Sequence, residues 1–159
     1  EAQLDRFMFI INVDYPTLKQ EVEIALTTTS GINSKMDIVL NAEQIQEFQK
    51  LIPSVPVSQH VAEFAVRLVQ SSRPNKNGTS LGFINEWVDW GAGPRASQHL
   101  LMGAKACALM DNRVTATIED VKRVTRQVLE HRIILNFKAE AENITTTDII
   151  EKLLESVKA

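Results

Sequence analysis

The sequence predicts a mainly α-helical protein: a helical bundle preceded by a short strand and one helix. In five segments after residue 41, apolar residues recur every three or four positions between capping residues and proline or glycine breakers. Phe7–Val13 differs, because its run of aromatic and branched residues favours a mostly buried strand. We therefore divide the chain near Gly31 into a short α/β part, residues 1–30, and a helical part, residues 31–159.

The composition is that of an ordinary globular protein. With 159 residues, 44% hydrophobic and 23% charged, the chain is long enough for one domain, or for one domain and part of another. The net charge of −3 provides no overall positive field, which argues against nucleic acid or an anionic membrane as a partner. A single cysteine, Cys107, fits a reducing compartment. Since the sequence contains no membrane-spanning run and no signal peptide, we expect a cytoplasmic protein.

The strand predicted at Phe7–Val13 stands alone in this chain. It is followed by Tyr15-Pro16-Thr17, which starts a helix with apolar residues at helical spacing. A lone strand leaves its backbone groups unpaired, so we expect its sheet partners to lie before Glu1. The chain also lacks an initiator Met, and we interpret it as a piece of a longer protein.

Five helices are predicted after this first part. Asn41 and Ser58 are suited to cap the first two, and Thr117 with Asp120 three residues later is suited to cap the fourth. The segment Leu81–Trp90 is compatible with either a short strand or a helical turn, and residues 73–78 are the clearest loop. The expected helices are residues 43–52, 58–73, 94–110, 117–135 and 146–157.

Arg95 lies in the first turn of the helix that starts at Pro94, which is an unfavourable place for a cation. The positive end of a helix dipole disfavours a positive charge by roughly 0.3 to 1 kcal/mol, so we expect an anion to share the site. Backbone N–H groups and a guanidinium that converge on one oxyanion are well suited to a phosphate. The same spacing also allows a guanidinium paired with a nearby carboxylate.

Each of the other candidate residues has an ordinary structural explanation when it is considered alone. Arg6, with Asp5 before it, is typical of a solvated strand edge. His131 continues the apolar stripe of its helix, which favours a partly buried structural histidine. Because His60, His99 and His131 are scattered and no acidic residue shows ligand spacing with them, we predict no metal site.

Four segments taken together resemble the MoxR family of AAA+ ATPases, in their order and separations as well as their sequences. The resemblance implies that residues 1–30 are the C-terminal remnant of the AAA+ α/β core and that residues 31–159 form the helical lid domain. The segments are EAQLDRFMF at 1–9, GAGPRASQHLLMGAKACAL at 91–109, VTATIEDVKRVTRQVLEHRIIL at 114–135 and ITTTDIIEKLLESV at 144–157.

The resemblance also implies roles for single residues. Arg6 is then the arginine finger, which points in trans into the nucleotide site of a neighbouring protomer and is worth about 10³ to 10⁵ in rate in other nucleotide hydrolases. Arg95 is then the sensor 2 arginine, which contacts an ATP phosphate in its own or the adjacent subunit. His131 and Arg132 match a family His-Arg pair, for which we expect a structural role. Family members commonly have Ser where this chain has Gly93.

One departure from the family matters for activity. The sequence contains no Gly-x-x-x-x-Gly-Lys-Ser/Thr segment, so we expect a core outside this chain to hold ATP and Mg²⁺. We expect that this chain alone does not hydrolyse ATP. The full protein would assemble into an AAA+ ring and couple ATP binding and hydrolysis to chaperone-like remodelling of client proteins, including proteins with von Willebrand factor A domains.

Two other functions remain open at this point. The first is a helical protein-interaction module with no nucleotide role. The second is a DNA-binding helix pair, residues 94–110 and 117–135, which carries several basic residues. The net acidity of the chain and the interspersed Glu and Asp residues argue against DNA.

Overall fold

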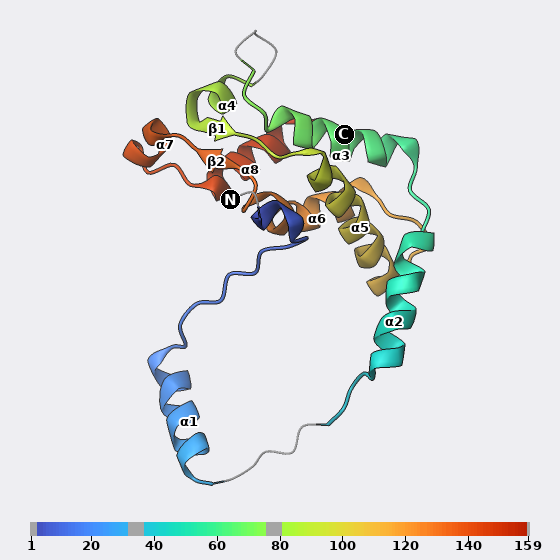
Figure 1. Cartoon of the computed structure of the whole chain (residues 1–159), viewed down its shortest axis with the longest axis vertical. Coiled ribbons are helices and arrows are strands. Elements are labelled where there is room, and N and C mark those ends of the chain that lie inside the picture. Colours follow the sequence, from blue (N-terminus) through green and yellow to red (C-terminus); the bar gives the residue numbers. More distant parts are fainter. Residues whose placement is uncertain (1–2, 32–36, 76–80, 159) are drawn as a thin grey trace.

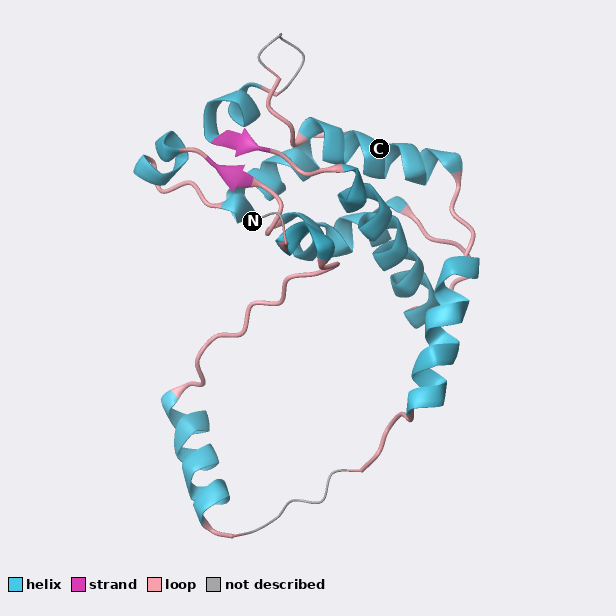
Figure 2. Cartoon of the chain, in the orientation of Figure 1, coloured by secondary structure: helices cyan, strands magenta, loops and turns pink. Residues whose placement is uncertain are grey.

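The computed structural model describes residues 3–31, 37–75 and 81–158, and helices dominate this part of the chain (Figure 2). The mainly α-helical fold predicted from the sequence is confirmed. In chain order the elements are η1 (Leu4–Arg6), α1 (Leu18–Thr29), α2 (Ala42–Leu51), η2 (Ile52–Ser54), α3 (Gln59–Ser71), α4 (Gly82–Trp87), β1 (Val88–Trp90), α5 (Pro94–Met110), α6 (Ile118–Leu129), β2 (Ile134–Leu135), α7 (Phe137–Ala141) and α8 (Thr146–Ser156).

Local capping places most of the helices where the sequence predicts them. The side chains of Asn41, Ser58 and Thr145 each accept a hydrogen bond from the backbone N–H three residues ahead, at the starts of α2, α3 and α8. Helix α5 begins at Pro94 and ends at Met110, as expected. Helix α1 ends before Gly31, whose φ of 70° is a left-handed conformation that favours glycine. The loop predicted at residues 73–78 is non-helical at 73–75, and residues 76–78 lie outside the described part.

The prediction of a strand at Phe7–Val13 is wrong. This segment has no regular secondary structure, and Figure 1 shows it leading away from the packed helices toward α1, which has no buried residue. A strand requires a paired backbone, and within the described residues no other strand lies beside this one. At its middle, the segment is instead attached to α6, where Ile10 N donates to Gln127 O at 2.9 Å.

The fourth predicted helix ends six residues early. Helix α6 stops at Leu129, and its last carbonyl accepts from both Arg132 N and Ile133 N. The chain then forms β2, which pairs antiparallel with β1 through Val88 and Leu135. Leu81–Trp90, which the sequence left undecided, therefore contains both a helical turn, α4, and a strand, β1.

The hydrophobic core lies between α3, α5, α6 and α8. Each of these helices contributes apolar side chains that are completely buried, and α5 packs against both α3 and α6. Small residues on α5 allow a close approach: a Cβ added to Gly103 would lie 3.0 Å from Val124 on α6. The completely buried large side chains include Phe64, Leu68, Leu100, Val121, Val128, Leu129, Ile149 and Leu153.

A small wing of α4, the two strands and α7 lies at one end of this core (Figure 1). Helix α7, which the sequence did not predict, is capped by the Asn136 side chain and packs against α4. The indole of Trp87 fixes the wing, because its Nε1 donates to Glu142 at 2.8 Å and its ring lies 4.1 Å from the Lys152 ammonium.

Candidate functional site

The loop before α5 is fixed in place by close packing against the end of α3. A Cβ added to Gly91 would lie 2.3 Å from the carbonyl oxygen of Ser72, so only glycine fits there without movement. The next residue, Ala92, is buried and donates its N–H to the Ser72 hydroxyl at 3.0 Å. Arg73 Nε donates to the Ala92 carbonyl at 2.8 Å. These contacts fix the start of α5, and therefore the position of Arg95.

Asp5 lies between Arg95 and Arg132. Its Oδ2 is 2.9 Å from Arg95 Nη1, and its Oδ1 is 3.0 Å from Arg132 Nε. One carboxylate thus joins η1 to the start of α5 and to the turn after α6. The sequence led us to expect an anion at Arg95, and within this chain the Asp5 carboxylate occupies that place.

The Arg95 side chain remains accessible although it is paired. It is 48% exposed and the Asp5 side chain is 38% exposed, so solvent screens the pair, and such surface pairs contribute about 0 to 1 kcal/mol. Among residues 3–31, 37–75 and 81–158, Asp5 is the one hydrogen-bond partner of this guanidinium. Its remaining N–H groups therefore face solvent at the positive end of α5.

Arg132, unlike Arg95, has a buried side chain, which is only 1% exposed. Besides Asp5 Oδ1, its guanidinium donates to the Asp5 carbonyl at 2.9 Å, the Phe7 carbonyl at 2.5 Å and the Met8 carbonyl at 3.4 Å, and it also bonds the Val128 carbonyl. Burial lowers the pKa of Arg132, and the Asp5 carboxylate opposes this effect. An arginine keeps its charge under these conditions, and the carboxylate and carbonyls compensate for its lost hydration.

Two histidines, His99 and His131, complete the cluster. His99 Nδ1 lies 2.8 Å from Arg132 Nη2, which can only donate, so Nδ1 is the acceptor and the ring proton is on Nε2. His131 Nε2 lies 3.1 Å from the Phe7 carbonyl, to which it donates. The pKa of each histidine is lowered, first by burial and then by the charge of Arg132. Both effects favour the neutral form of each ring, and for His99 the accepting Nδ1 requires it.

Arg6 follows Asp5 in the chain, but among the described residues its side chain makes no hydrogen bond to this cluster. It is exposed on η1, and its Nη1 donates to Gln3 at 2.9 Å. Because Asp5 is its neighbour in the chain, the backbone of Arg6 is held close to the start of α5. The structure thus brings the two arginines singled out from the sequence to one region of the molecule.

Sequence reasoning missed Asp5, His99 and the full role of Arg132. Asp5 was read as part of a solvated edge, although its contacts with Arg95 and Arg132 span 90 and 127 residues of sequence. No spacing rule links positions so far apart. The available signal was that Asp5 directly precedes Arg6, while Arg132 lies in the His-Arg pair of the third matched segment.

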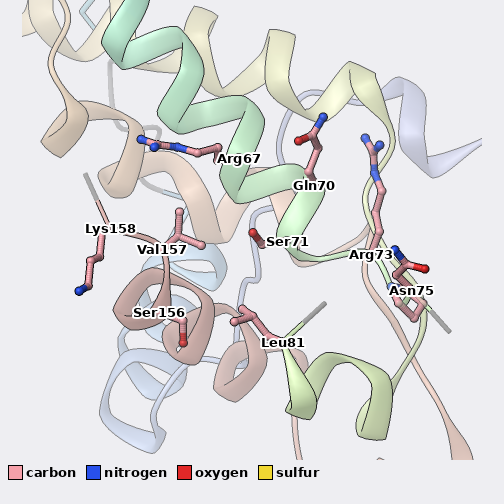
Figure 3. A pocket seen from close by; sticks show the side chains of 10 residues that line it. Arg67, Gln70, Ser71, Arg73, Asn75, Leu81, Ser156, Val157 and Lys158 are labelled. Carbon is pink, nitrogen blue, oxygen red and sulfur yellow. The ribbon is translucent and has the colours of Figure 1, made fainter. Parts of the chain in front are cut away.

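A hollow of about 750 Å³ lies where α3 and α8 end, and we assign no ligand to it. It is lined by Arg67, Arg73 and Lys158, but Figure 3 shows these side chains pointing apart instead of toward one centre. Cations near helix C-termini complement the negative end of the dipole and require no bound anion. Among the described residues there is also no group of three or more His, Cys, Asp or Glu side chains placed to hold a metal ion.

Comparisons with known proteins relate the chain to a lid domain family and to MoxR proteins. The AAA lid domain family matches residues 84–153. The chaperone MoxR1 of Mycobacterium tuberculosis is 32% identical over 99% of this chain, and the protein MoxR of Paracoccus denitrificans is 27% identical over 85% of it. The crystal structure of a candidate ATPase from Cytophaga hutchinsonii matches 99% of the chain with a TM-score of 0.85 and 34% identity. The chain is homologous to MoxR proteins over nearly its whole length.

The homology concerns one part of these larger proteins. The chain spans 41% of the Mycobacterium protein, 43% of the Paracoccus protein and 48% of the Cytophaga chain. The matched lid family begins within α4 and ends within α8, so it contains the wing, α5 and α6, and therefore both Arg95 and Arg132. No helix in the described part of this MoxR homologue is long and apolar enough to cross a membrane.

Proposed function

We propose that this chain is the C-terminal, lid-containing part of a MoxR-type ATPase that couples ATP binding and hydrolysis to chaperone-like remodelling of partner proteins. The observation that carries the proposal is the Asp5 bridge, because it holds the exposed Arg6 beside the half-exposed Arg95. Arg6 directly follows the residue that binds Arg95, and two arginines whose backbones are held close together suit the phosphates of a nucleotide. The lid family match and the chaperone name of a relative support the same function.

In this proposal Arg6 is the arginine finger. It is exposed on a short turn, and a finger in a ring must reach the nucleotide of the neighbouring protomer. Its guanidinium would neutralise the charge that develops on the transferred phosphoryl group. The chain then acts on ATP only within an assembled ring, with ATP and Mg²⁺ held by a phosphate-binding loop outside this chain.

Arg95 is the sensor 2 arginine in the same proposal. A triphosphate carries more negative charge than a carboxylate and offers several acceptors, so it competes effectively with Asp5 for this guanidinium. The position at the start of α5 adds backbone N–H groups and the helix dipole to the attraction. Since Asp5 joins Arg95 to the turn that carries Arg6, we expect both arginines to contact one nucleotide, that of the neighbouring protomer.

We further propose that residues 1–30 belong to the ATPase core and residues 31–159 to the lid. Support comes from alternate apolar residues between η1 and α1: Phe7, Phe9, Ile11 and Val13 are 64%, 39%, 77% and 87% exposed. Helix α1 likewise exposes Leu18, Val22 and Leu26. An apolar surface of this extent is typical of an interface, which supports contact with an ATPase core outside this chain.

The proposal is tested by replacing each arginine in the whole protein. With Arg6→Ala we expect ATP still to bind, while turnover falls by about 10³- to 10⁵-fold, because the finger acts on the transition state. Arg67→Ala on α3 is the matched control, since this arginine is exposed and, among the described residues, is not bonded to Asp5, Arg95 or Arg132, and its turnover stays normal. Wild-type turnover in Arg6→Ala refutes the finger assignment.

Arg95→Ala separates the ATPase function from the alternative of a helical interaction module. If Arg95 is sensor 2, the variant weakens ATP binding or hydrolysis in the assembled ring. If ATP affinity, hydrolysis and assembly are all unchanged, the interaction module is the better description. The clients, for which we expect proteins with von Willebrand factor A domains, are then sought by testing whether they stimulate turnover.

A further inference from the structure

We propose that Arg132 is a positioning residue for Arg6: it fastens the turn that carries Arg6, which we assign to the core, to the lid helices, so that lid and core are joined at this turn. The inference rests on the proposed function, in which Arg6 completes the nucleotide site of a neighbouring protomer. Arg132 itself touches no nucleotide in this scheme, because its side chain is buried.

The contacts of Arg132 lie on both sides of Arg6. Its guanidinium binds the Asp5 carboxylate and the Asp5 carbonyl before Arg6, and the Phe7 and Met8 carbonyls after it. Four acceptors that flank one residue fix the backbone of that residue in place and direction. By contrast, the Arg6 side chain has its own hydrogen bond only to Gln3 within the described residues. The direction in which Arg6 extends is therefore set by the backbone that Arg132 holds.

Arg132 is itself fixed to the lid. It follows α6 directly, bonds the Val128 carbonyl of that helix, and donates to His99 on α5. His131 beside it donates to the Phe7 carbonyl, which adds a second bond from the same turn. The anchor thus joins α5 and α6, which pack closely, to the turn η1.

The two oxygens of the Asp5 carboxylate bind different arginines: Oδ1 binds the buried Arg132 and Oδ2 binds the exposed Arg95. When a phosphate engages Arg95, Asp5 Oδ2 loses its partner, but Oδ1 and the three carbonyls stay on Arg132. The turn therefore remains docked while Arg95 changes partner. A lid displacement caused by nucleotide at Arg95 is then passed to Arg6 through Arg132.

The test is a double-mutant cycle in the whole protein between Arg6→Ala and Arg132→Lys. Lysine keeps the positive charge but lacks the planar fork that reaches several acceptors at once. We expect Arg132→Lys to lower kcat by about 10- to 100-fold with the KM for ATP changed less than about threefold, because a displacement near 1 Å has effects of this size. In the Arg6→Ala background the same change has no further effect on kcat.

Matched variants keep a loss of stability apart from a loss of positioning. Arg113→Lys disturbs another arginine pair of the lid, the one with the buried Asp120, and lowers the unfolding temperature without lowering kcat. If Arg132→Lys fails to fold, Asp5→Ala replaces it, since it removes the carboxylate bond from a partly exposed residue. Asp5→Ala then lowers kcat, and this effect also disappears in Arg6→Ala.

The outcomes separate this inference from the function on which it rests. If Arg6→Ala retains full turnover, the proposed function fails. If Arg6→Ala is inactive but Arg132→Lys, or Asp5→Ala in its place, keeps wild-type kcat, the positioning role alone is overturned. An additive double mutant overturns it as well, because Arg132 would then act independently of Arg6.

Discussion

Gly91→Ala tests how the lid holds the start of α5. The added Cβ would lie 2.3 Å from the Ser72 carbonyl oxygen and 2.6 Å from the Arg73 Cα, whereas unstrained contacts of this kind are about 3.5 Å long. Both neighbours are backbone atoms at the end of α3, so no side-chain rotation relieves the clash. The loop must therefore move by about 1 Å, which weakens the bonds that Ala92 makes with Ser72 and Arg73.

The loss of stability in Gly91→Ala is expected to match that of other substitutions that add atoms to a packed site, which destabilise proteins by about 1 to 3 kcal/mol. We expect Gly91→Ala to lower the free energy of unfolding in guanidinium chloride by this amount, measured by circular dichroism. The control is Gly93→Ala, two residues away, where φ is −79° and nothing lies within 4 Å of the added Cβ. Because Gly93 is the N-cap of α5, where glycine is preferred to alanine, its change should stay below about 1 kcal/mol. Equal unfolding midpoints for the two variants would refute this account of the loop.

Two further predictions concern charge. Arg113 and the hydrogen bonds from Thr117 lower the pKa of Asp120 to about 2, so its stabilising effect is present above its ordinary value of 3.8 and is lost as pH falls through about 2. Asp120→Asn should cost about 1.5 to 3 kcal/mol at pH 7, and the difference from wild type, measured by chemical denaturation, should shrink between pH 4 and pH 2. The pKa of His99 is lowered from 6.5, mainly by burial, so the unfolded chain binds the proton more readily and stability falls as pH drops below about 6.5. His99→Asn, which offers Arg132 an acceptor that does not titrate, should lose less stability than wild type between pH 7 and pH 5; equal losses would contradict the assignment.

The helices could be predicted where their signals are local. Asn41 and Ser58 cap helices through atoms three residues away, and Pro94 starts α5 because its ring suits a first turn. The strand predicted at Phe7–Val13 is absent because a strand depends on a second strand beside it, and no pattern within seven residues reports whether one is there. The end of α6 was misplaced for a related reason, since β2 exists through its pairing with β1 and not through its own two residues.

In the candidate site, too, local features could be predicted and long-range contacts could not. Arg6 and Arg95 were selected from their chemistry and their sequence context, and their roles at a nucleotide stay predictions. The contacts that unite them were not predictable from spacing, because Asp5 meets Arg95 and Arg132 only after α5 and α6 have packed together. Arg132 was expected to be structural, and its burial among carbonyls agrees with that, while the place of those carbonyls around Arg6 adds the positioning role proposed above.

By itself, then, the sequence determined the helical class, the limits of most helices and the arginines most suited to an anion, since these depend on periodicity, caps and side-chain chemistry within a few residues. Only the tertiary structure decided which anion lies at Arg95 in this chain and what holds Arg6. Those contacts are made between segments 90 and 127 residues apart, and they form only when folding brings η1, α5 and the end of α6 together around one carboxylate.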